Sequence, residues 1–263
     1  MIIPKVDTYV NYLYYGFMNY DPVKYVEFFH LVFLDQLGRK LDRRLYALKG
    51  GCNLRFFLRS IRYSQDIDLD VKTVRVETLQ KTVNGILKSS GLALLLQGQS
   101  LELAQVSEAK QTETTQRWKV QLKGPAGNVF PTKIEFSRRG LEVPVGFETI
   151  DAQVLNAYRL RPIFVPHYGP ESAFRQKISA LASRTETQAR DIWDLFHLIH
   201  AYGVKDKNNA DLVKACENVH NISYNDFKDQ VVAFFPEDLQ SQYNRESWDT
   251  IQLKVLEYLE SLK

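Results

Sequence analysis

Apolar residues recur at helical spacing near the start of the sequence. The pair Asp21-Pro22 predicts a helix start, because Asp accepts a hydrogen bond from the first turn and Pro fits the first helical position. The apolar residues that follow repeat at the i, i+3, i+4 spacing of one buried helix face: Tyr25, Phe28, Phe29, Val32 and Phe33. We expect this helix to pack into the core, with His30 as a core or surface histidine and not a ligand.

Residues 66–71 have a different pattern, a strict alternation of polar and apolar residues. In Asp-Ile-Asp-Leu-Asp-Val the side chains alternate between the faces of a predicted strand, with the apolar residues on one face and three aspartates on the other. Leu45–Leu48 predicts a second short strand, which leads into Gly50-Gly51 and then into a helix-like segment, Asn53–Arg59.

The middle of the chain predicts one helix and several strands. Val74–Ser90 has an amphipathic helical pattern that ends at Ser89-Ser90-Gly91. Strands are predicted over Leu92–Leu96, Glu102–Val106, Arg117–Leu122 and Phe130–Ser137. Gly124–Asn128 is rich in turn residues, so the last two strands should form a hairpin. Glu135 would lie on the polar face of the final strand.

Residues 138–168 are interrupted by Pro and Gly and contain short β-like pieces, which we interpret as a connection to a helical C-terminal part. Helices are predicted there over Glu171–Arg184, Arg190–Ile199, Leu212–Val219, Phe227–Phe235 and Trp248–Leu262. The sequence therefore predicts an α/β (α+β) fold. A small mixed sheet would lie within a core domain over residues 1–165, followed by a helical domain over residues 166–263, with a cleft between them.

Composition describes an ordinary globular protein of 263 residues with 44% hydrophobic and 25% charged residues. A formal charge of +3 permits nucleic-acid binding without arguing for it. Cys52 and Cys216 have no metal-ligand spacing, so we interpret them as buried or incidental thiols. The sequence has neither a signal-peptide pattern nor an apolar run near the roughly 20 residues that span a bilayer. We expect a cytoplasmic protein without membrane contact. The five tyrosines within residues 1–20 predict a segment that packs on the body or stacks on bases.

Gly50-Gly51 is the first candidate for chemistry. Two glycines let the backbone take a positive φ and lie close to a ligand, and a following helix start favours phosphate. The alternative is an ordinary turn. The basic run Arg39–Arg44 nearby is open to two readings as well, a solvated turn or a contact for a polyanion.

The aspartate strand is the second candidate. Asp66 and Asp68 would lie about 7 Å apart along the strand, close enough to converge on Mg²⁺ that also holds substrate phosphates. The alternative is a solvated strand face. Three like charges on one face repel at this spacing, however, and a bound cation would relieve that repulsion.

Together these residues resemble a known family. Gly50-Gly51 followed by Ser64-x-Asp66-Ile-Asp68 resembles the signature of the polymerase-β-like nucleotidyltransferase superfamily. With Lys49 and Arg62 added, the pattern is similar to that of the AbiEii-type nucleotidyltransferase toxins of type IV toxin–antitoxin and abortive-infection systems. The resemblance implies a polymerase-β-like core, in which Lys49, Gly50, Gly51, Arg62 and Ser64 contact the nucleotide and Asp66 and Asp68 hold Mg²⁺ or Mn²⁺.

A second motif agrees with the first. AbiEii-type enzymes have a helical Lys followed by Arg-Asp-x-x-Asp-Leu, which Lys177 and Arg190–Leu195 match. The resemblance implies that Lys177 stabilises the departing pyrophosphate. Asp191 and Asp194 share one helix face, so one could orient Lys177 while the other holds Arg190 or acts as a base. The alternative is an ion-pair cluster on a helix surface.

Glu135 resembles the third carboxylate that polymerase-β-like enzymes hold on a neighbouring strand, although an exposed glutamate is an equal reading. The resemblance implies transfer of NMP from an NTP to a hydroxyl of nucleic acid or protein, by a toxin paired genetically with an antitoxin. For some relatives the acceptor is the 3′ end of tRNA. The sequence also leaves open a non-catalytic NTP sensor and a metal-dependent phosphohydrolase.

Overall fold

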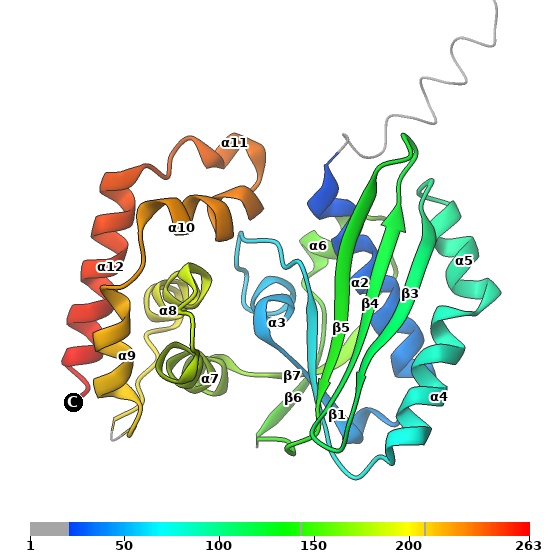
Figure 1. Cartoon of the computed structure of the whole chain (residues 1–263), viewed down its shortest axis with the longest axis horizontal. Coiled ribbons are helices and arrows are strands. Elements are labelled where there is room, and N and C mark those ends of the chain that lie inside the picture. The colour runs from blue at the N-terminus through cyan, green and yellow to red at the C-terminus, as the bar shows by residue number, and fades with distance from the viewer. Residues whose placement is uncertain (1–20, 143, 208) are drawn as a thin grey trace, which may run out of the picture.

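The computed structural model describes residues 21–142, 144–207 and 209–263 (Figure 1). Its helices are α2 (Pro22–Lys40), α3 (Gly50–Phe56), α4 (Val76–Leu87), α5 (Ser90–Gln97), α6 (Ala152–Ala157), α7 (Pro170–Ser183), α8 (Ala189–Tyr202), α9 (Leu212–Val219), α10 (Tyr224–Gln230), α11 (Glu237–Gln240) and α12 (Arg245–Glu260), with short 3₁₀ turns at Arg43–Leu45 and Val232–Phe234. Its strands are β1 (Tyr46–Lys49), β2 (Ile67–Val71), β3 (Glu102–Gln111), β4 (Thr115–Lys123), β5 (Val129–Ser137), β6 (Val145–Thr149) and β7 (Phe164–Tyr168). The tyrosine-rich segment over residues 1–20 lies outside the described residues.

The strands form one mixed sheet of seven, in the order β3-β4-β5-β2-β1-β7-β6. Neighbouring strands are antiparallel except for β2 beside β5 and β1 beside β7, which are parallel. The predicted α/β class with a mixed sheet is confirmed. The predicted hairpin at Gly124–Asn128 is also present, because β4 pairs with β5 from Thr115 opposite Ser137 to Lys123 opposite Val129.

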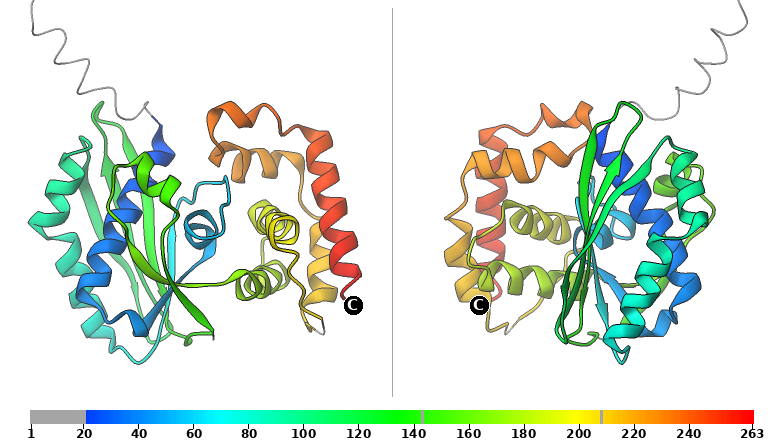
Figure 2. Two further views of the ribbon diagram at one scale, coloured as in Figure 1. Left: turned by 180° about the vertical axis from the view of Figure 1, so that it is seen from behind. Right: turned by 45° about the vertical axis from the view of Figure 1, so that its right-hand side comes forward.

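Helices cover the two sides of the sheet unequally (Figures 1 and 2). α2, α4 and α5 lie along one face, whereas α7 to α12 form a helical part on the other side. Apolar side chains form two clusters, one between the sheet and α2, α4 and α5, and one inside the helical part. Helix α3 joins them, because Cys52 and Phe56 belong to the first cluster while Leu54 belongs to the second. The start of α3, including Gly50 and Gly51, is therefore held in place by packing of α3 against both apolar clusters.

The predicted strand over Leu92–Leu96 is wrong, because these residues lie in helix α5. Ser89 caps that helix by accepting a hydrogen bond from the backbone N–H of Leu92 at 3.2 Å. Leu92 and Leu96, four residues apart, are buried, whereas Leu94 is 68% exposed. A short leucine run is compatible with either element, and the N-cap with tertiary packing selected the helix.

Residues 138–168 do more than connect two parts. They contain β6 and β7, and β7 adds to the sheet beside β1. Asn53 of α3 fixes the end of β7 by donating a hydrogen bond to the carbonyl oxygen of Tyr168 at 2.9 Å. The sheet therefore continues to Tyr168, and α7 begins two residues later at Pro170.

The predicted helices over Val74–Ser90, Glu171–Arg184, Arg190–Ile199, Leu212–Val219 and Trp248–Leu262 correspond to α4, α7, α8, α9 and α12, and the reading of the two thiols is also confirmed. The helices predicted over Asn53–Arg59 and Phe227–Phe235 end earlier than expected, because α3 ends at Phe56 and α10 ends at Gln230 before a 3₁₀ turn. Asp21 caps α2 and Pro22 occupies its first turn. Cys52 and Cys216 are buried free thiols. In the basic run, Arg39 pairs with Asp35 and Arg44 with Asp42 on the surface, as expected of solvated side chains. None of the described helices has both the length and the apolar character needed to cross a bilayer.

His30 lies inside the core, as the sequence suggested. Its Nε2 is 2.8 Å from the hydroxyl oxygen of Thr132 on β5, and its Nδ1 is 3.4 Å from the sulfur of Cys52. Burial lowers the pKa of His30 from 6.5 to about 3. Its role is to satisfy polar groups in the core between α2, α3 and β5.

The buried His30 should make stability depend on pH. Between pH 6.5 and 3 the unfolded chain binds a proton at His30 that the folded chain excludes, so stability falls as pH falls through this window. The slope from one such group is about 1.4 kcal/mol per pH unit. Urea unfolding of the wild type and His30→Gln at several pH values in this window should give a shallower slope for the variant. Equal slopes would contradict the assignment.

Candidate active site

A cleft of about 700 Å³ lies between the polar face of β2 and β5 and the helix α7. The sheet side carries Asp66, Asp68 and Glu135, and α7 contributes Lys177. The predicted nucleotide contacts Lys49, Gly50, Gly51, Arg62 and Ser64 also line it. Asp191 and Asp194, the remaining predicted site residues, are fully buried behind Lys177. Residues far apart in the sequence thus come together in one cleft.

The carboxylates are arranged by strand register. β2 and β5 run parallel with Asp68 directly beside Glu135, so both side chains lie on the same face. Burial of the Asp68 carboxylate, together with the negative charges of Asp66 and Glu135, raises its pKa. Lys133 pairs with Asp66 at 2.7 Å, and Arg117 pairs with Glu135 at 2.7 Å. The structure therefore surrounds Asp68 with negative charge that cations counterbalance.

Two glycines place the backbone against these side chains. Gly50 has a φ of +68°, and a Cβ at this position would lie 2.8 Å from a carboxylate oxygen of Asp68. A Cβ on Gly51 would lie 2.6 Å from the hydroxyl oxygen of Ser64. Ser64 in turn donates a hydrogen bond to the carbonyl oxygen of Asp66 at 2.8 Å. Glycine is required at both positions because β2 and the loop before it pack directly on the start of α3.

Gly51→Ala should weaken nucleotide binding. The added methyl group forces Ser64 out of its place, and the hydrogen bond from Ser64 to Asp66 is lost with it. A loss of about 1.4 kcal/mol corresponds to roughly tenfold weaker binding of NTP in a calorimetric titration. Gly85→Ala in α4 is the matched control, since a Cβ there meets nothing within 4 Å. The control should bind NTP normally, and equal binding by both variants would contradict the role of Gly51.

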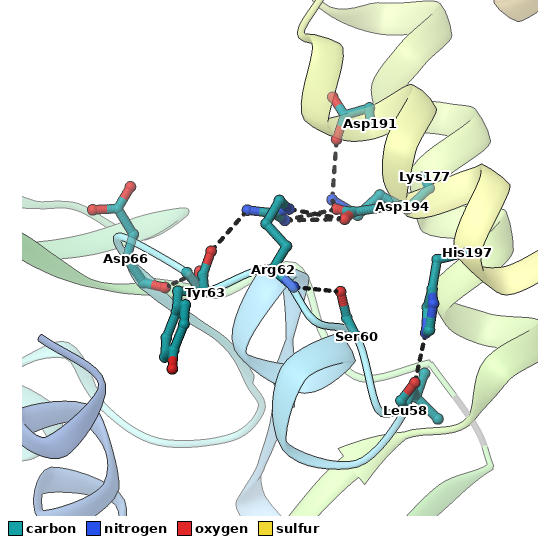
Figure 3. A network of polar contacts seen from close by, with 10 residues as sticks. Leu58, Ser60, Arg62, Tyr63, Asp66, Lys177, Asp191, Asp194 and His197 are labelled. Atoms are coloured by element: carbon teal, nitrogen blue, oxygen red, sulfur yellow. Dashed lines mark hydrogen bonds and ion pairs between the residues drawn. The ribbon is translucent and has the colours of Figure 1, made fainter. Parts of the chain in front are cut away.

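Lys177 is held by two buried aspartates (Figure 3). Its ammonium nitrogen lies 3.0 Å from an oxygen of Asp191 and 2.6 Å from an oxygen of Asp194. Arg184 adds a second ion pair to Asp191 at 3.0 Å. Both aspartates of the Arg-Asp-x-x-Asp motif therefore orient Lys177. Because both carboxylates are already engaged by cations, a role in positioning Lys177 suits them better than a role as a base.

Arg62 forms part of the cleft wall and is only 4% exposed. Its guanidinium donates to both carboxylate oxygens of Asp194 at 3.0 Å and to the carbonyl oxygen of Tyr63. Burial alone would raise the pKa of Asp194, but Arg62 and Lys177 outweigh it and hold that pKa below its ordinary value. Asp194 is thus paired with Arg62, whereas Arg190 lines the cleft. Arg62 connects the loop before β2 to α8.

The sequence did not predict a second network of polar side chains in the cleft, which is formed by Lys49, Asp70 and Tyr168. Lys49 pairs with Asp70 at 2.5 Å, and the hydroxyl of Tyr168 donates to the other oxygen of Asp70 at 2.8 Å. The alternation in residues 66–71 put Asp70 on the right face, but nothing in the sequence pointed to Tyr168 at the end of β7. Asp70 is engaged by these two partners. Asp66 is paired with Lys133 and could receive a cation only after leaving it, whereas Asp68 forms no ion pair among the residues that the structure describes.

The residues fit a divalent metal only if the substrate completes the site. Among the described residues, no cluster of three or more His, Cys, Asp or Glu side chains could enclose a metal ion. Asp66 and Asp68 supply two carboxylates beside an open cleft. Mg²⁺ usually binds through one or two carboxylates, waters and substrate phosphates, so this donor set suits it. The raised pKa of Asp68 marks a position where a cation would be stabilising.

Comparison with known proteins agrees with this geometry. Residues 32–261 match the family model described as nucleotidyl transferase AbiEii toxin, type IV TA system. No curated protein matches the sequence. Among solved structures, the chain resembles MenT4, a nucleotidyltransferase toxin from Mycobacterium tuberculosis, with a TM-score of 0.60 and 17% identity over 90% of this chain and 84% of that one. It also resembles JHP933 from Helicobacter pylori, with a TM-score of 0.51 and 17% identity over 90% and 92% of the two chains. The latter two matches show that the fold is shared.

Proposed function

Because the chain belongs to the family of AbiEii nucleotidyltransferase toxins of type IV toxin–antitoxin systems, we propose that it transfers NMP from an NTP to a hydroxyl of nucleic acid or protein. The observation that carries this proposal is the convergence of Asp66, Asp68, Gly50, Gly51 and Lys177 on one cleft. The predicted family resemblance and the enzyme class are confirmed by the match to the family model. Mg²⁺ dependence and the acceptor are parts of the proposal.

In the proposed reaction the acceptor hydroxyl oxygen attacks the α-phosphorus of the NTP. The bond from the α-phosphorus to the bridging oxygen breaks, pyrophosphate leaves with that electron pair, and the hydroxyl proton passes to solvent or a nearby carboxylate. Gly50, Gly51 and Ser64 would hold the phosphates, with the backbone of α3 close to them. Lys177 faces the leaving group as a fixed positive charge.

Asp66 and Asp68 would hold Mg²⁺, which supplies charge neutralisation of the triphosphate and a lower pKa for the attacking hydroxyl. Glu135 lies beside Asp68 in register but is paired with Arg117. It would join the metal shell only after leaving that partner. The family assignment implies that the protein inhibits growth and is encoded with an antitoxin.

We also propose a division of the chain into a nucleotidyltransferase core and a helical domain that contributes Lys177 and its aspartates. The two apolar clusters support this division. The boundary predicted at residue 165 lies inside β7, so the helical domain is better begun after Tyr168.

The test is incubation of the purified protein with Mg²⁺, total RNA and each α-³²P-labelled NTP in turn, resolved on denaturing gels beside Asp66→Ala. Label in a tRNA-sized band that requires Asp66 would support transfer to RNA. Label in a protein band would support a protein acceptor.

Two other results would replace the proposal. Binding of Mg-NTP in a calorimetric titration without any labelled product would favour an NTP sensor. Release of inorganic phosphate in place of pyrophosphate would mark a phosphohydrolase.

A further inference from the structure

Lys49 pairs with a diagonal neighbour on the sheet and not with the residue directly opposite it. Antiparallel pairing of β1 and β2 sets Lys49 opposite Asp68 and Ala47 opposite Asp70. Residues directly opposite on an antiparallel pair have the closest side chains, and opposite charges at such positions attract, although long side chains also reach the diagonal neighbour. The ammonium nitrogen of Lys49 lies 2.5 Å from an oxygen of Asp70. The diagonal pair is therefore the one that the structure selects.

Tyr168 of β7 holds Asp70 in the orientation that favours this pair. The side chain of Tyr168 is fully buried, and its hydroxyl donates a hydrogen bond to the second oxygen of Asp70 at 2.8 Å. The hydroxyl oxygen accepts a hydrogen bond from the backbone N–H of Glu142 at 3.1 Å, and Asn53 donates to the carbonyl oxygen of Tyr168. Because the ring, the hydroxyl and the backbone of Tyr168 are all engaged, Asp70 presents its other oxygen to Lys49 in one orientation.

This arrangement leaves one carboxylate of the cleft without a cation from the protein. The other three carboxylates on this side of the sheet are each paired: Asp66 with Lys133, Glu135 with Arg117 and Asp70 with Lys49. Asp68 forms no ion pair among the residues that the structure describes. Asp68 is therefore the carboxylate that a divalent cation can approach without displacing an ammonium or guanidinium group.

Lys49 is the cation best placed to change this. Its charge already opposes the rise in the pKa of Asp68 that burial and Asp66 cause, so Lys49 lies within electrostatic reach of Asp68. A lysine side chain is a flexible stem that carries a point charge. If Asp70 did not hold it, the ammonium group could pair with Asp68, which lies directly opposite on the neighbouring strand.

We propose that Tyr168 and Asp70 are positioning residues that hold Lys49 on Asp70 and thereby keep Asp68 free for the divalent cation. This inference rests on the proposed function, because the cation belongs to that reaction, and it deepens it by assigning two residues that act through Lys49. If Asp70 were instead a further metal ligand, or if Tyr168 only stabilised the fold, the effect of changing either residue would not depend on Lys49.

Binding of Mn²⁺ alone tests this positioning without requiring transfer. Electron paramagnetic resonance of the free ion gives the affinity, and the titration extends to millimolar Mn²⁺ because carboxylates bind the ion weakly without substrate phosphates. Tyr168→Phe keeps the buried ring and changes no charge, but it releases one oxygen of Asp70. Lys49 should then pair with Asp68 in part of the molecules. Mn²⁺ should bind about fivefold more weakly, since a partly exposed ion pair is equivalent to a factor of up to about five.

Tyr158→Phe is the matched control. The hydroxyl of Tyr158 donates to the buried Glu27 at 2.9 Å, and neither residue lines the cleft. The control variant thus loses a similar hydrogen bond elsewhere in the core and should bind Mn²⁺ like the wild type. Thermal melting of both variants separates a loss of Mn²⁺ affinity from a general loss of stability.

The Lys49→Met background separates positioning from a purely structural role. Once the ammonium group of Lys49 is removed, Tyr168→Phe should cause no further change in Mn²⁺ affinity. Equal weakening by Tyr168→Phe in the wild-type and Lys49→Met backgrounds would overturn the inference. Unchanged affinity in the single variant Tyr168→Phe would overturn it as well.

A crystal structure of Asp70→Asn gives a direct readout. Asn keeps the shape of Asp70 and still accepts from Tyr168, but it lacks the charge that holds Lys49. The ammonium nitrogen of Lys49 is expected about 2.8 Å from an oxygen of Asp68, and a Lys49 that points away from Asp68 would contradict the inference. If Mn²⁺ binding and this structure agree with the expectation but the wild type forms no labelled product with any NTP, the proposed function fails while the positioning of Lys49 stands.

Discussion

Asp68→Asn is expected to lower the rate of nucleotidyl transfer by on the order of a thousandfold while leaving the protein folded. The carboxylate of Asp68 lies beside Glu135 of β5 and near Asp66, which directly precedes β2, and burial and these two charges raise its pKa. The proposed metal contributes several kcal/mol of transition-state stabilisation, and each 1.36 kcal/mol is a factor of about ten in rate. The amide has the same shape but lacks the charge needed to hold the cation.

The same substitution, Asp68→Asn, should raise the stability of the folded protein or leave it unchanged. The charged Asp68 sits among like charges, so Asn removes repulsion that folding otherwise has to overcome. Thermal melting followed by circular dichroism should give a midpoint no lower than that of the wild type. Asp35→Asn in α2, a surface carboxylate paired with Arg39, is the control and should keep full activity. An Asp68→Asn variant that is folded and retains wild-type activity would contradict the proposed mechanism.

Arg62→Ala should be the most destabilising single change at the site. Its guanidinium and the Asp194 carboxylate are both buried, and the substitution leaves Asp194 without its bidentate partner. Breaking a buried ion pair by removing one partner costs about 3–5 kcal/mol. For a chain of this size the midpoint of thermal unfolding should fall by on the order of 10 °C. Activity should fall as well, because Asp194 also orients Lys177.

A surface pair provides the comparison for Arg62. Lys214 and Glu217 form an ion pair in which both side chains are more than half exposed, so Lys214→Ala should change stability by less than about 1 kcal/mol. Denaturant unfolding of the two variants separates the cases. If Arg62→Ala unfolds at the same denaturant concentration as Lys214→Ala, the Arg62–Asp194 pair does not join the core to the helical part.

Local patterns predicted the elements whose cause is local. Helix α2 begins where Asp21 caps it and Pro22 fits the first turn. The alternation over residues 66–71 predicted the strand β2 with Asp68 and Asp70 on one face and Asp66 directly before it. The strand predicted over Leu92–Leu96 is wrong because a short run of leucines shows no clear periodicity. The N-cap at Ser89 and the burial of Leu92 and Leu96, four residues apart, favour the helix.

The sequence by itself determined which residues are candidates for the chemistry, because Gly50-Gly51, Asp66-Ile-Asp68 and Lys177 with its downstream aspartates each form a short motif. Tertiary structure alone decided their partners. Arg62 pairs with Asp194 across 132 residues, and Tyr168 reaches Asp70 across 98. It also decided that the cations of β4 and β5 align with the carboxylates of β2, because strand register depends on pairing between segments distant in the chain. No local pattern encodes such contacts, since their energy comes from burial and charge pairing that exist only after the sheet and the helices have packed together.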